Sequence, residues 1–161
     1  MKRPELLKLL NLSTFTAFDF ETTGLDSSQD RVIEVAAIRF ENGEITEKFV
    51  QLINPEKKIS AMITRLTGIS NKMVRNAPTE EMVIDDLLGF IGKSPLVAHN
   101  IHFDQNFLIK MCERLGRDVP KFERYDTLQL ARTLFFQQPV FNLGALSEYF
   151  GLSSEGSHRA E

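Results

Sequence analysis

The sequence contains few of the residues that build disulfide-linked or zinc-stabilised scaffolds. Among its 161 residues there are one cysteine (Cys112), three histidines and no tryptophan. A single cysteine cannot form an intramolecular disulfide, and no cysteine and histidine spacing typical of a zinc finger is present. These absences exclude disulfide-rich secreted domains and zinc fingers, and they favour a reducing, cytoplasmic location.

Long apolar runs are also absent. No stretch of the sequence approaches the roughly 20 apolar residues that a bilayer-spanning helix needs. The N-terminal segment MKRPELLKLLNLS carries Pro4 and Glu5 where a signal peptide would be continuously apolar. We therefore expect neither membrane insertion nor export. The length and the 42% content of hydrophobic residues predict a single folded domain.

Positive charge is not in excess, because 19 lysines and arginines face 22 aspartates and glutamates and give a net charge of −3. Such a chain has no global basic field that would attract nucleic acid, so attraction would have to come from local basic groups or bound cations. The segment 57–76 is both a candidate surface for tracking phosphates and an ordinary solvated loop. It has no acidic residue and five basic ones: Lys57, Lys58, Arg65, Lys72 and Arg75.

The pattern of apolar residues predicts an α/β domain with a mixed sheet. Strands are expected at 15–20, 32–40 and 45–53, followed by a short strand at 96–99. The dipeptide Asn42-Gly43 predicts that the second and third strands form a hairpin. Helices are expected at 79–91, 102–115, 126–135 and 143–150. Strands that come first, with strand–helix alternation later, are typical of this fold class.

The most informative segment for function is Phe18-Asp19-Phe20-Glu21, in the first predicted strand. Alternate residues of a strand share a face, so Asp19 and Glu21 project together while the two phenylalanines are buried on the other side. Two carboxylates in one place repel each other unless a proton or a cation intervenes, and hard divalent cations suit all-oxygen sites. Two solvated acids at a strand end are the alternative interpretation.

Two later residues are candidates for the same site. Asp104 lies in the first turn of a predicted helix, just after the strand at 96–99. This is the sheet edge at which α/β proteins build their sites, so Asp104 could join Asp19 and Glu21, although a role as a helix cap explains it equally well. His158 lies near the end of the sequence, and by itself it is compatible with an idle exposed side chain.

Three segments taken in order resemble the DEDDh, or DnaQ-like, 3′-5′ exonucleases, the family that includes the proofreading subunit or domain of bacterial replicative polymerases. Residues 18–25 resemble the first motif, residues 97–104 the second, and His158-Arg159-Ala160 the start of the third. The resemblance extends over residues 15–161. It implies a ribonuclease H-like fold, with antiparallel strands 1–3 followed by alternating strands and helices.

The resemblance also implies a reaction, namely two-metal hydrolysis of phosphodiester bonds at the 3′ ends of single-stranded DNA or RNA. Asp19, Glu21 and Asp104 would bind two Mg²⁺ or Mn²⁺ ions, which stabilise the attacking and leaving oxygens. His158 would be the general base, since an imidazole takes up a proton near neutral pH. The family further implies a polymerase or helicase as partner, and no residue decides between DNA and RNA.

Substrate contacts implied by the resemblance lie next to the first and second motifs. The backbone of Thr22, Thr23 and Gly24 would approach the terminal nucleotide. Leu25 and Phe103 would pack against bases or sugars. Apolar contacts of this kind do not depend on the identity of the base. Phe103 is equally compatible with an ordinary place in the core.

The sequence departs from the family at the end of the third motif. The family has an aspartate five residues after its histidine, whereas Glu161, the last residue, follows His158 by three. We therefore expect residues 1–161 to form a single exonuclease domain that lacks its C-terminal helix and the last part of the third motif. A catalytically deficient, nucleic-acid-binding module of a larger assembly is the alternative, and internally cutting ribonuclease H-like nucleases are a further rival class.

Overall fold

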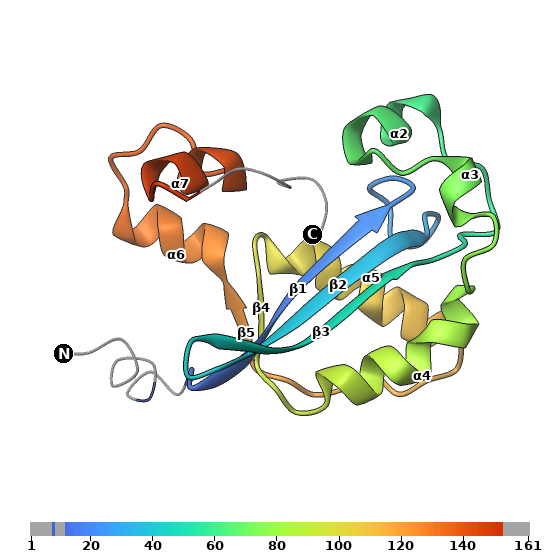
Figure 1. Cartoon of the computed structure of the whole chain (residues 1–161), viewed down its shortest axis with the longest axis horizontal. Helices are drawn as coiled ribbons and strands as arrows, with labels where there is room; N and C mark the ends of the chain where they lie inside the picture. The colour runs from blue at the N-terminus through green and yellow to red at the C-terminus, as the bar shows by residue number, and fades with distance from the viewer. Residues whose placement is uncertain (1–7, 9–11, 153–161) are drawn as a thin grey trace.

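A mixed five-stranded sheet organises the chain in the computed structural model, which describes residue 8 and residues 12–152 (Figure 1). The strands lie in the order β3-β2-β1-β4-β5; β1, β2 and β3 are antiparallel, and β4 and β5 run parallel to β1. The predicted mixed sheet is thus confirmed. The strands are β1 (Thr14–Thr22), β2 (Val32–Glu41), β3 (Glu44–Leu52), β4 (Leu96–Ala98) and β5 (Arg124–Asp126).

Local sequence signals account for the hairpin between β2 and β3. Asn42 and Gly43 both adopt positive φ angles, 53° and 91°, which a two-residue hairpin turn of this kind requires. Glycine and asparagine tolerate that backbone conformation better than other residues. The hairpin that Asn42-Gly43 predicts is confirmed.

Four of the helices lie within one or two residues of their predicted bounds. These are α4 (Glu80–Ile91), α5 (Ile101–Arg114), α6 (Thr127–Leu134) and α7 (Leu143–Tyr149). Two short helices, α2 (Ala61–Thr67) and α3 (Asn71–Val74), were not predicted. They are too short to show a helical period, and each begins at a serine, Ser60 or Ser70, whose hydroxyl accepts a backbone N–H of the first turn.

The main core lies between one face of the sheet and helices α4 and α5. Phe18 and Phe20 of β1 point to this face and pack among buried residues of both helices, including Leu87 and Phe107. A smaller apolar cluster around Ile63 joins α2 and α3 to the start of β2. Because side chains alternate along a strand, burial of the two phenylalanines directs the acids of β1 to the opposite face.

Strand β4 is shorter than β1, and this leaves part of β1 without a strand neighbour on that side. Leu96 and Val97 pair with Thr16 and Ala17, and the pairing stops there. The backbone of β1 around Phe20 therefore has its hydrogen-bonding edge open towards the start of α5. No helix in the described residues is long and apolar enough to cross a membrane.

Candidate active site

Asp19 and Glu21 share the face of β1 that is turned away from the core. Asp19 is exposed and Glu21 is half-buried, while Phe18 and Phe20 between and beside them are buried. This is the alternation that the sequence predicts. The two acids lie near the carboxyl end of β1, so the chain leaves the site directly through Thr22 and the loop that follows.

Asp104 is brought to the same part of β1 by the first turn of α5. Its Oδ1 accepts the backbone N–H of Phe20 at 2.8 Å, across 84 residues of sequence, and only 2% of Asp104 is exposed. The carboxylate thus occupies the edge of β1 that β4 leaves unpaired. The N-cap position of α5 belongs to Asn100, and Asp104 lies in the first turn of the helix, where the helix dipole also stabilises its charge. This arrangement favours the interpretation of Asp104 as a site residue.

The electrostatics of the three acids show that they form one coupled group. Burial, and then the charge of Asp19, raises the pKa of Asp104 to about 8, although the N–H of Phe20 opposes the rise. Burial, Asp19 and Glu34 raise the pKa of Glu21 to about 7. Although the side chain of Asp19 is the most exposed of the three, the protein around its carboxyl group displaces water and raises its pKa above the usual value, against the opposing effect of His99. Glu21 and Asp104 are therefore costly to ionise while Asp19 is charged.

The donor set fits a divalent cation, because oxygen ligands suit Mg²⁺ and Mn²⁺ and a cation would relieve the repulsion that raises these pKa values. In the part of the chain that the structure describes, however, no group of three or more histidine, cysteine, aspartate or glutamate side chains is arranged to hold a metal ion. Asp19, Glu21 and Asp104 are therefore electrostatic neighbours without a formed coordination shell.

Two candidate site residues were missed by sequence reasoning. Glu34 of β2 is opposite Glu21 in the β1–β2 ladder, is 5% exposed and helps to raise the pKa of Glu21. A glutamate inside the apolar run of β2 was the available signal. His99, just after β4, acts electrostatically on Asp19, and its Nδ1 lies 3.1 Å from the hydroxyl of Thr127.

The predicted substrate residues Thr22, Thr23, Gly24 and Leu25 form the exit from β1. Thr22 and Thr23 are buried, and the Thr22 hydroxyl donates to the carbonyl of Gly24 at 2.6 Å. Leu25 is 86% exposed and is thus free to contact a ligand. Phe103 is half-buried and packs against the core, with its ring centroid 4.9 Å from that of Phe107.

His158 and Glu161 lie outside the described residues, so the general base and the end of the third motif stay predictions. Asp126 lies at the start of α6, where its Oδ1 accepts the N–H groups of Leu128 and Asn100 at 2.9 and 3.0 Å. Asp126 thereby ties α6 to the left-handed turn at Asn100 from which the helix of Asp104 begins.

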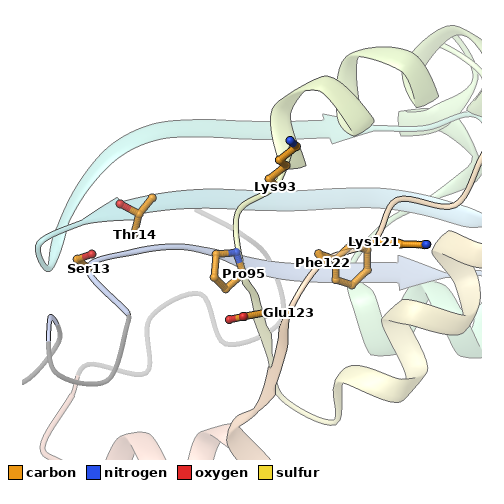
Figure 2. Close-up of a pocket in the computed structure, with 7 residues that line it drawn as sticks. All are labelled: Ser13, Thr14, Lys93, Pro95, Lys121, Phe122 and Glu123. Carbon is orange, nitrogen blue, oxygen red and sulfur yellow. The ribbon is translucent and has the colours of Figure 1, made fainter.

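A hollow of about 610 Å³ lies at the other end of the sheet from these acids (Figure 2). It is formed where β1, β4 and β5 begin, whereas Asp19 and Glu21 lie near the carboxyl end of β1. Its lining consists of residues 13 and 14, Lys93, Pro95 and residues 121–123. The hollow is therefore separate from the acidic site.

Comparison with known proteins agrees with the motifs. A family model described as "RNase_T: Exonuclease" matches residues 16–161. The 3′-5′ exonuclease DinG of Bacillus subtilis (strain 168) is 40% identical over 153 residues, which make up 94% of this chain and 16% of DinG. A PolC-type DNA polymerase III of Caldanaerobacter subterraneus subsp. tengcongensis is 39% identical over 146 residues, or 91% of this chain and 10% of the polymerase.

Solved structures agree on the fold. The crystal structure of E. coli exonuclease I in complex with a dA16 oligonucleotide matches with a TM-score of 0.82 and 22% identity, covering 92% of this chain and 37% of that one. This match confirms the predicted ribonuclease H-like architecture. Because the family model covers nearly the whole sequence, including the strand and helix that carry Asp19, Glu21 and Asp104, this chain belongs to the RNase_T exonuclease family, as its DnaQ-like motifs predict.

Proposed function

We propose that this chain is a metal-dependent 3′-5′ exonuclease domain that hydrolyses single-stranded DNA from its 3′ end. The observation that carries the proposal is the convergence of Asp19, Glu21 and Asp104 from two distant segments, where Asp104 accepts the N–H of Phe20 and the charge of Asp19 raises the pKa values of both Glu21 and Asp104. A structural acid cluster would be expected to lie beside basic partners, whereas burial and acidic neighbours dominate here. The name of the DinG relative, a 3′-5′ exonuclease, supports the direction of hydrolysis.

In this proposal Asp19, Glu21 and Asp104 hold two Mg²⁺ or Mn²⁺ ions. Such ions supply positive charge against the phosphate that is attacked and the oxygen that leaves. A water oxygen would attack phosphorus, the bond from phosphorus to the 3′ oxygen of the preceding nucleotide would break, and that oxygen would take up a proton from solvent. A nucleoside 5′-monophosphate and a new 3′ hydroxyl would be the products. His158 accepts the proton of the water, a contribution of roughly 10²- to 10⁴-fold in rate for general bases.

The terminal nucleotide lies, in this proposal, beside the loop that leaves β1. The backbone of Thr22, Thr23 and Gly24 approaches the sugar and phosphate, and Leu25 contacts a base through its exposed side chain. Apolar contact of this kind tolerates every base because each base has an apolar face. Phe103 is the weaker candidate for base contact, since its ring already packs on Phe107.

The basic segment 57–76 is proposed to bind the backbone of the strand further from its end. Lys58, Arg65 and Lys72 are exposed, and the last two belong to α2 and α3, which lie beyond the carboxyl end of β1 (Figure 1). Replacing all three by alanine should weaken DNA binding. It should also reduce the slope of log K against log salt concentration by about 2, because each phosphate contact in a single strand contributes roughly 0.7 to that slope. Fluorescence anisotropy across a salt series measures the slope.

A matched control removes three exposed lysines elsewhere, namely Lys48, Lys93 and Lys121. The two triple variants have the same net charge, so the control separates local phosphate contacts from the overall charge of the domain. Equal slopes for the two variants would show that segment 57–76 is a solvated loop.

The shape of the substrate tests the proposed function directly. Linear single-stranded DNA with a free 3′ hydroxyl should be shortened in the presence of Mg²⁺ or Mn²⁺, whereas a 3′-blocked strand and a circular strand of the same sequence should persist. Gel analysis of end-labelled DNA, with EDTA as the metal-free control, gives the readout. Degradation of the circular strand would indicate an internally cutting nuclease and would contradict the proposal. If none of the substrates is degraded, the proposal is also contradicted and a binding module is indicated.

The setting of the domain is also part of the proposal. The chain spans 16% of DinG and 10% of the PolC-type polymerase, so a polymerase or helicase would be supplied by further protein. Residues 1–161 would act as one exonuclease domain in the cytoplasm. An RNA strand of the same sequence, run beside the DNA, determines whether a 2′ hydroxyl is accepted.

A further inference from the structure

We propose that Asp30 is a positioning residue that sets the shape of the substrate loop at residues 22–25. The proposal rests on the proposed function, in which that loop receives the terminal nucleotide. Asp30 lies at the far end of the connection between β1 and β2, just before Val32 begins the second strand. Its side chain is directed back onto the start of the same connection, as the contacts below show.

Three donors hold the Asp30 carboxylate in place. Its Oδ1 accepts the hydroxyl of Thr23 at 2.9 Å and the ammonium of Lys57 at 3.3 Å, and its Oδ2 accepts the backbone N–H of Asp26 at 3.1 Å. Thr23 is in turn paired with Arg31 through both its backbone N–H, at 2.9 Å, and its hydroxyl, at 3.1 Å. The carboxylate therefore closes the connection into a loop whose two ends are fixed to each other.

Gly24 is packed directly against this carboxylate. A β-carbon added at Gly24 would lie 2.3 Å from Oδ2 of Asp30 and within 2.9 Å of the other two carboxyl atoms. The glycines of the described chain with positive φ do not include Gly24, so its backbone accepts a side chain, and the three atoms nearest to an added β-carbon all belong to Asp30. The contact with Asp30 thus sets the path of the backbone at Gly24. That path in turn sets the direction of the exposed side chain of Leu25.

The carboxylate is held in its charged form. Partial burial would raise the pKa of Asp30, but the hydrogen bonds from Asp26, Thr23 and Lys57 outweigh it and hold the pKa below its usual value. Lys57 belongs to the basic segment 57–76, so the same ion pair joins that segment to the substrate loop. Asp30 contacts none of the three acids proposed to bind metal through any of these bonds, which makes it a positioning group and not a reacting one.

The test is a double-mutant cycle between Asp30 and Gly24 in the whole chain, with linear single-stranded DNA as substrate. Asp30→Ala should raise KM roughly tenfold and change kcat by less than about threefold, because the loop that binds the nucleotide is loosened while the reacting groups stay. Gly24→Ala should raise KM by a similar factor through its clash with the carboxylate. In Gly24→Ala/Asp30→Ala the clash is gone, so KM should stay within about twofold of Asp30→Ala alone.

Two companion variants separate positioning from general damage to the fold. Asp30→Asn keeps the bulk beside Gly24, so Gly24→Ala/Asp30→Asn should remain worse than Asp30→Asn alone, unlike the alanine pair. Asp85→Asn removes an exposed carboxylate on α4 that pairs with Arg117, and it should leave KM and kcat unchanged. Thermal unfolding of each variant shows whether the protein is folded at the assay temperature.

The outcomes distinguish this inference from the proposed function. A wild-type chain that never shortens linear DNA contradicts the proposed function, and the Asp30 inference then falls with it. An active wild type whose KM is unchanged in Asp30→Ala contradicts the inference alone. So does a double variant in which the two increases in KM multiply, because Asp30 and Gly24 would then act independently.

Discussion

Asp104→Asn is expected to lower the rate of hydrolysis roughly 10³-fold, which corresponds to about 4 kcal/mol of lost transition-state stabilisation. The asparagine oxygen can still accept the N–H of Phe20 that Asp104 accepts at 2.8 Å, so the start of α5 should stay attached to β1. What disappears is the negative charge proposed to bind a divalent cation. Single-turnover assays with saturating DNA and a titration of Mn²⁺ measure the loss.

The matched control for this substitution is again Asp85→Asn, an aspartate on α4 that is far more exposed than the 2% of Asp104. It should retain wild-type hydrolysis. Full activity in Asp104→Asn would show that this carboxylate does not bind a required cation. Circular dichroism shows whether an inactive Asp104→Asn protein is folded. If it is unfolded, Asp104→Glu replaces it as the test variant, because it keeps the negative charge and changes only the position of the carboxylate.

Stability of the metal-free protein is expected to fall as the pH rises from 5 to 8. The folded-state pKa values of Glu21 and Asp104 are raised to about 7 and about 8, from their usual values of 4.5 and 3.8. Between the unfolded and folded pKa values the folded state holds more protons, so its stability decreases with increasing pH. We expect the Tm in EDTA to drop by about 5 °C or more across this range.

Between pH 5 and 8, the other acids with altered pKa values do not contribute to the expected change in stability. The pKa values of Asp26, Asp30 and Asp85 are lowered, so these groups are ionised in both states above pH 5 and contribute no slope there. Mn²⁺ or Mg²⁺ should restore the Tm at pH 8, because binding to the folded state alone stabilises it. Asp104→Asn should flatten the dependence in EDTA. A Tm that is constant or rises from pH 5 to 8 would contradict the coupling of these carboxylates.

Local pattern was sufficient for much of the fold and for the nature of the site. The alternation Phe18-Asp19-Phe20-Glu21 predicted two buried rings and two acids on the other face, and the structure has this arrangement. It was not sufficient for α2 and α3, which consist of seven and four residues and depend on serine caps in place of an apolar period. Glu34 was missed because it matters only through its position opposite Glu21. That position depends on the register of β1 against β2, which the sequence pattern does not give.

The amino-acid sequence by itself determined the class of fold, the hairpin at Asn42-Gly43 and the family, because strand period, turn chemistry and short motifs are properties of neighbouring residues. Tertiary structure alone decided that β4 stops short of Phe20 and leaves an edge for Asp104, and that Asp30 lies against Gly24. These contacts join residues distant in sequence, and their energies depend on packing and burial, which no local pattern contains.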